Sequence, residues 1–138
     1  MSSWTLLQKP GVDYRVNNPY RKLVLEIDEP YVSMIIEKII TNAAQHTTKG
    51  SVLARYDYIG ESLMVSIEDT GDGIPANNID HIFERFVSGA NTGVGLGLSI
   101  CHELIEYMGG RIQLKSTVGK GTVVWFTLPC KVLEMERQ

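Results

Sequence analysis

The feature that most constrains the fold is a set of short segments in which apolar and polar residues alternate. Such alternation is typical of strands with one buried face. These segments come in pairs, at residues 11–18 and 22–27, 51–58 and 62–68, and 111–116 and 121–128. Between the pairs, apolar residues at helical spacing predict a helix from Asp28 to about Gly50, a short helical segment over 77–86, and a helix through Ile100 and Met108.

Strands that come in pairs favour a mixed or antiparallel sheet with the helices on one face, and they disfavour a doubly wound parallel sheet. We therefore expect an α+β fold, a two-layer sandwich with a mostly antiparallel sheet. The chain divides into a lead-in over residues 1–10, one domain over 11–130, and a tail or linker over 131–138.

Composition and charge exclude several classes of protein. The 138 residues carry a net charge of −3 and two cysteines, which form no disulfide framework. The sequence holds no apolar run long enough to cross a bilayer and no signal peptide, which predicts a cytoplasmic location. It also has no basic cluster of the kind that binds nucleic acid.

Two glycine-rich segments interrupt the regular pattern, from Asp69 to Pro75 and from Ser88 to Ser99. Their spacings fit neither a P-loop nor a dinucleotide-binding fingerprint. The second segment precedes a predicted helix, whose free N–H groups are suited to phosphate oxygens. A flexible connection packed by Leu96 and Leu98 is the alternative interpretation.

Four motifs occur in one order: Asn42, Asp69 to Gly73, Phe83 to Phe86, and Gly93 to Leu98. Together with Gly119 to Thr122, this order resembles the ATP-binding domain of bacterial sensor histidine kinases, within the superfamily that includes gyrase, Hsp-type chaperones and mismatch-repair ATPases. The resemblance spans residues 26–128 and implies the same α/β sandwich, of the Bergerat type.

The resemblance also implies roles for individual residues. Asn42 corresponds to the ligand of the Mg²⁺ that bridges the ATP phosphates, and Asp69 to the carboxylate that accepts a hydrogen bond from the adenine amino group. Thr122 corresponds to a threonine that completes the adenine end through water. The residues implied to lie along the base are Gly71, Gly73 and Ile74.

The remaining motifs correspond to the lid over the nucleotide. Phe83 and Phe86 resemble the aromatic pair at the lid hinge, although core packing explains them equally well. Arg85 would approach the γ-phosphate, and an arginine on an exposed helix face is the alternative interpretation. The lid itself would span residues 87–92. The segment that meets the phosphates would comprise Gly93, Gly95, Leu96, Gly97 and Leu98.

This chain departs from the family pattern around Asn42. Lys38 stands where relatives usually have asparagine, and Gln45 stands where they have a basic residue. On a helix, Lys38 lies about 40° and Gln45 about 60° from Asn42, so all three share a face. We expect Lys38 to supply the positive charge that Gln45 does not; a solvated surface lysine is the alternative. His46, one turn after Asn42, would contact phosphate or cap the end of the helix.

The implied activity is transfer of the γ-phosphoryl group of Mg-ATP to a histidine. His102 is expected to be an ordinary helix residue, so the acceptor would lie on a separate dimerisation domain of a parent kinase, with a response regulator downstream. Any contact with a membrane would come through that parent. The alternatives are a non-catalytic ATP-binding module and a related serine kinase or ATPase.

Overall fold

Five strands form a mixed sheet in the order β1-β3-β4-β6-β5. The computed structural model describes residues 11–45, 47, 49–73 and 94–138, with the backbone alone for 94–97. Strand β1 runs parallel to β3, and the other neighbours are antiparallel. The strands of this main sheet are β1 (Val12–Asn17), β3 (Gly50–Ile59), β4 (Ser62–Asp69), β5 (Arg111–Thr117) and β6 (Gly121–Pro129).

Two helices lie against the main sheet. Helix α1 (Glu29–Gln45) packs on β3 and β4, α3 (Val94–Tyr107) packs on β5 and β6, and the helices contact each other. Asp28 begins α1 as its N-cap, because its carboxylate accepts a hydrogen bond from the Tyr31 N–H at 3.2 Å. Helix α1 ends at Gln45, about one turn before the predicted end near Gly50.

The core lies between the main sheet and the helices. Every second residue of β4 and β6 is buried on the helix side, and the alternate residues face outward. The largest buried side chains come from both layers: Ile35, Ile39, Ile40, Ile67, Leu98, Ile105, Phe126 and Leu128. The α+β fold expected from the strand pattern is thus confirmed for the described residues.

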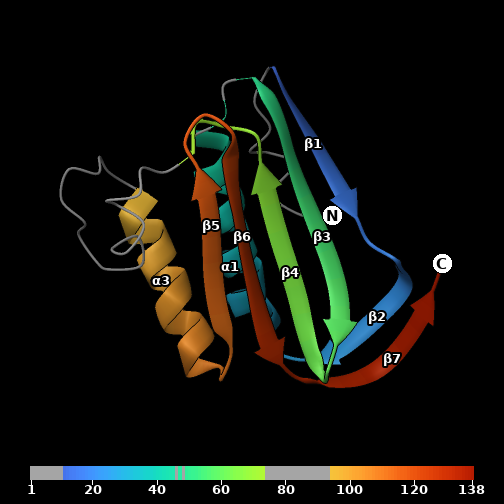
Figure 1. Cartoon of the computed structure of the whole chain (residues 1–138). Coiled ribbons are helices and arrows are strands. Elements are labelled where there is room, and N and C mark those ends of the chain that lie inside the picture. Colours follow the sequence, from blue (N-terminus) through green and yellow to red (C-terminus); the bar gives the residue numbers. More distant parts are fainter. Residues whose placement is uncertain (1–10, 46, 48, 74–93) are drawn as a thin grey trace.

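A second, two-stranded sheet joins β2 (Tyr20–Glu26) to β7 (Lys131–Arg137) in antiparallel register. We call this pair the ribbon; Figure 1 shows it curving away beside β3 and β1. The pattern of residues 131–138 suggests a tail or linker, whereas the structure shows most of this segment as a paired strand. Strands β1 and β2, adjacent in the chain, belong to different sheets.

The ribbon is anchored to β3 by one buried tyrosine. Tyr20 donates a hydrogen bond to the Asp57 carboxylate at 2.6 Å and accepts one from the Tyr58 N–H at 3.0 Å. The Arg137 guanidinium lies 4.9 Å from the centre of the Tyr20 ring. Burial and the Asp57 bond raise the pKa of Tyr20, and the same bond lowers the pKa of Asp57.

Candidate functional site

The motifs that are far apart in the sequence meet at one end of the main sheet. Figure 1 shows the C-terminal end of α1, the end of β4, the β5–β6 turn and the beginning of α3 at the same end of the molecule. We call this the motif end. It is the region where the sequence predicts a nucleotide site.

Three polar side chains form a row across the sheet at the motif end. Asp69 on β4 lies opposite Thr122 on β6, and Thr122 lies opposite Ser116 on β5. The strand alternation that buries Ile67 and Val124 places Asp69 and Thr122 on the same, helix-facing side, where both are nearly fully buried. The apolar core ends at this row, so the polar side chains of the row lie next to buried apolar side chains.

Hydrogen bonds orient the members of the row. The Asp69 carboxylate accepts a bond from the Gly71 N–H at 2.9 Å. The Ser116 hydroxyl donates to the Gly121 carbonyl at 3.2 Å and lies 2.7 Å from the Thr122 hydroxyl oxygen. The side chains are therefore held by their neighbours in defined positions.

Two glycines allow the backbone to close around the row. Gly121 has φ +132°, and a Cβ there would lie 2.0 Å from the Asp69 carbonyl oxygen. Gly73 has φ +77°, and a Cβ there would lie 2.3 Å from the Thr117 carbonyl oxygen. Larger residues would therefore push the segment after β4 away from the β5–β6 turn.

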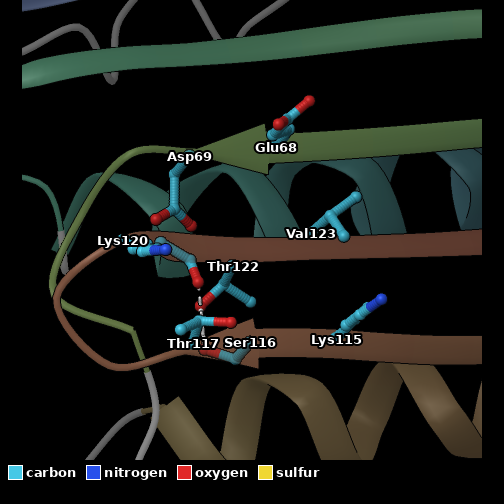
Figure 2. Close-up of a pocket in the computed structure, with 9 residues that line it drawn as sticks. Glu68, Asp69, Lys115, Ser116, Thr117, Lys120, Thr122 and Val123 are labelled. Carbon is cyan, nitrogen blue, oxygen red and sulfur yellow. Dashed lines mark hydrogen bonds between the residues drawn. The ribbon is translucent and has the colours of Figure 1, made fainter.

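The row borders a hollow at the end of β4, β5 and β6. Figure 2 shows Asp69, Thr122 and Ser116 on neighbouring strands around it, with the turn at Lys120 beside them. Lysines and acidic residues both contribute to its lining. The lining residues are Glu68, Asp69, Lys115, Ser116, Thr117, Lys120, Gly121, Thr122 and Val123.

Asn42 lies in the last turn of α1 and is also nearly fully buried. Its side-chain oxygen accepts no hydrogen bond from the part of the chain that the structure describes. A buried oxygen without a donor is costly unless another group satisfies it. An amide oxygen of this kind is a ligand that Mg²⁺ accepts, so the residue fits the metal-binding role that the sequence implies.

Lys38 lies one turn before Asn42 and is half-buried, whereas Gln45 is exposed. Burial raises the pKa of the Cys101 thiol on α3 to about 12, and the Lys38 ammonium opposes that rise. Lys38 is therefore close enough to α3 to act on its groups electrostatically.

Part of the second glycine-rich segment, residues 94–98, belongs to α3. Gly95, Leu96 and Gly97 belong to the beginning of α3, and Leu98 is fully buried in the core. The predicted residues His46, Ile74, Phe83, Arg85, Phe86 and Gly93 lie outside the described residues, as do the predicted helix over 77–86 and the lid.

Ser116 was not among the residues singled out from the sequence. The signal was available, because Ile112, Leu114 and Ser116 alternate along one strand and place the serine on the core side. A serine in a strand is common, and only the register with Thr122 shows its place in the row.

The fold and the motif end define a two-layer α+β nucleotide-binding domain. A family profile described as "Histidine kinase-, DNA gyrase B-, and HSP90-like ATPase" matches residues 27–132. The chain belongs to this family, and it is an ATP-binding catalytic domain of the sensor histidine kinase type.

Two curated sensor kinases that resemble this chain agree with this membership. The chain is 36% identical over 135 residues to sensor histidine kinase WalK of Bacillus subtilis. This alignment covers 91% of this chain and 22% of WalK. It is 35% identical over 125 residues to sensor protein kinase WalK of Staphylococcus saprophyticus, with 84% and 20% covered. The chain thus spans about a fifth of the length of these curated relatives.

Solved structures show the same fold. The catalytic domain of histidine kinase ThkA in a nucleotide-free form matches with a TM-score of 0.77 at 26% identity, covering 91% of this chain and 82% of that one. Full-length ShkA in complex with AMPPNP matches with a TM-score of 0.77 at 28% identity, covering 93% and 26%. Among the described residues, no helix has the length and apolar character needed to cross a membrane.

Proposed function

We propose that this domain binds Mg-ATP and transfers the γ-phosphoryl group to a histidine on a separate dimerisation and phosphoacceptor domain, in two-component signal transduction. The observation that carries the proposal is the buried Asn42 oxygen, which accepts no hydrogen bond from the described residues and lies at the same end as the row of Asp69 and Thr122. The Asn42 oxygen suits a cation bound to the phosphates, whereas Asp69 and Thr122 suit the base, so the three residues would contact opposite ends of a nucleotide.

Asn42 would hold the Mg²⁺ that accompanies the triphosphate. Magnesium retains several waters and takes few protein oxygens, so a single amide ligand is sufficient. When bound, the ion neutralises charge that develops on the phosphoryl oxygens. The chain's own part is to supply a preplaced oxygen, which α1 holds by packing on β3 and β4.

Asp69 would select adenine at the other end of the nucleotide. Its carboxylate only accepts hydrogen bonds, and the adenine 6-amino group donates them, whereas guanine carries an acceptor oxygen at that position. The Gly71 N–H already holds one carboxylate oxygen. This fixes the carboxylate before any ligand arrives.

Lys38 would supply positive charge on the phosphate side. It lies one turn before Asn42 and acts electrostatically on Cys101 of α3, the helix whose beginning carries the glycines assigned to the phosphates. Free N–H groups at the beginning of a helix attract phosphate oxygens. Lys38 and the N-terminal end of α3 would then act on the same charged group, together with Arg85 as predicted from the sequence.

A histidine acceptor suits the residues around Asn42. Because protonated imidazole has a pKa of about 6.5, histidine at neutral pH is largely neutral and nucleophilic without a general base. Positioning and charge neutralisation are then sufficient for the transfer. Glu37, the carboxylate nearest to Asn42 in the sequence, lies about 140° from it around the helix. The partners would be the phosphoacceptor domain of a cytoplasmic or membrane-bound parent kinase and its response regulator.

Titration calorimetry with Mg-ATP and Mg-GTP tests the site. We expect the wild-type domain to prefer ATP and the Asp69→Ala variant to lose at least about tenfold in ATP affinity, because a charged hydrogen-bond acceptor is removed. Asp13→Ala is a matched control, since that carboxylate is exposed on β1 and pairs with Arg15. Its ATP affinity should equal that of the wild type.

Transfer of labelled phosphate from ATP to a supplied phosphoacceptor hairpin tests the reaction. Label on the hairpin, and none when its histidine is replaced by alanine, supports the kinase. ATP binding without any transfer would favour the non-catalytic module, and release of free phosphate instead would favour an ATPase. A folded wild-type domain that binds no nucleotide would contradict the proposal.

A further inference from the structure

Ser116 is the member of the row that neither the sequence motifs nor the proposed function uses. It lies at the end of β5, lines the hollow with Asp69 and Thr122, and contacts Thr122 through its hydroxyl. We propose that Ser116 is a positioning residue that fixes the Thr122 hydroxyl as a hydrogen-bond acceptor toward the adenine end of the nucleotide. This inference rests on the proposed function.

The positions of the protons follow from the partners. A serine hydroxyl has one proton, and a backbone carbonyl can only accept. Because Ser116 donates to the Gly121 carbonyl at 3.2 Å, its proton is not available for the 2.7 Å contact with Thr122. Thr122 must then be the donor in that contact, which leaves the lone pairs of its oxygen for another partner.

The consequence is that two acceptors lie side by side on neighbouring strands. Asp69 is an acceptor by its chemistry, and Thr122 becomes one through Ser116. Both side chains are at least nine-tenths buried, where the local dielectric is low and a fixed hydroxyl direction has a stronger effect than in water.

Two adjacent acceptors prefer a base edge that offers two donor hydrogens. The 6-amino group of adenine carries two, and it can reach Thr122 directly or through a bound water. Hypoxanthine carries an acceptor oxygen at the same position and offers only one donor hydrogen beside it, at N1, so it cannot supply a donor to both side chains. Ser116 therefore contributes to the choice of ATP over ITP without touching the base itself.

The test compares Mg-ATP and Mg-ITP affinities of the wild-type domain with those of Ser116→Ala and Ser116→Thr. In Ser116→Ala the Thr122 hydroxyl can turn and donate, so we expect ATP affinity to fall about five- to tenfold and ITP affinity to change less than about twofold. Ser116→Thr keeps the hydroxyl, so it should retain the wild-type preference for ATP over ITP.

A double-variant cycle separates positioning from a general structural effect. Thr122→Val removes the hydroxyl through which Ser116 acts, so adding Ser116→Ala to it should change neither affinity further. Ser66→Ala, on the outer face of β4, is the matched strand-serine control and should leave both affinities unaltered. Thermal unfolding of each variant verifies that it is folded.

The outcomes are distinguishable. Equal losses for ATP and ITP, additive losses in the double variant, or unchanged selectivity in Ser116→Ala would each overturn the role of Ser116 while leaving ATP binding intact. A folded wild-type domain that binds neither nucleotide would contradict the proposed function and this inference with it.

Discussion

The main sheet and the ribbon are stabilised by different forces. The main sheet packs fully buried apolar side chains such as Phe126 and Ile39 against the helices. The ribbon leaves Leu133 and Met135 about half exposed and packs Leu23 and Leu25, which are only partly buried, against the core. It is also held by the buried Tyr20 and by ion pairs at its surface. We infer that the main sheet carries the stability of the whole domain, whereas the ribbon can loosen on its own.

Removing a core side chain should have the largest effect. Phe126→Ala is expected to lower the free energy of unfolding by about 3 to 5 kcal/mol, because a fully buried ring leaves a cavity between the main sheet and the helices. Denaturant titration measures the loss, and Ile59→Ala, at an exposed position, should cost less than about 0.5 kcal/mol. Similar losses in the two variants would contradict the assignment of the core.

Removing the tyrosine anchor should have a smaller and more local effect. Tyr20→Phe is expected to cost about 1 to 3 kcal/mol, because the Asp57 carboxylate loses a charged hydrogen bond. Hydrogen–deuterium exchange should become faster in β2 and β7 and stay slow in β4 and β6. Faster exchange throughout the domain would show that the ribbon and the main sheet unfold together.

The stability cost of Tyr20→Phe should also depend on pH. Because Tyr20 lowers the pKa of Asp57 in the folded state, this stabilisation is present above the unfolded pKa of about 4 and is lost as the pH falls through the lower folded value. The cost of Tyr20→Phe should therefore shrink in strong acid.

The exposed ion pair should have the smallest effect. Lys22 and Glu134 lie 3.0 Å apart, and both side chains are about half exposed. A double-mutant cycle with alanine at both positions should give a coupling of at most about 0.5 kcal/mol, which falls further in high salt. A coupling above about 1 kcal/mol would mean that the ribbon depends on its surface pairs as well as on Tyr20.

Local patterns in the sequence predicted most of the elements but not all of their partners. The β3–β4 and β5–β6 hairpins follow from alternation around short turns, and α1 begins at the predicted Asp28. The parallel pairing of β1 with β3 was not predictable from turn signals, because it joins segments separated by α1. The same holds for β7, whose partner β2 lies more than 100 residues away.

The candidate site was predicted in its motifs rather than in its geometry. Asp69 and Thr122 were named from the family resemblance, and the strand register shows that they are direct neighbours. Strand alternation places Ser116 on the core side, but its role could be found only through its contacts, because that role depends on where the Gly121 carbonyl lies. The burial of the Asn42 oxygen, which accepts no hydrogen bond from the residues that the structure describes, likewise depends on packing between layers.

The pairing of β2 with β7 also sets an order of events during synthesis. Tyr20 and Arg137 are 117 positions apart, so the contact between them cannot form until almost all of this sequence has been made. Contacts of such high sequence separation form slowly, since a long loop must close first. The strands of the main sheet are all complete by Pro129, and the ribbon is therefore the last part of the domain to be added.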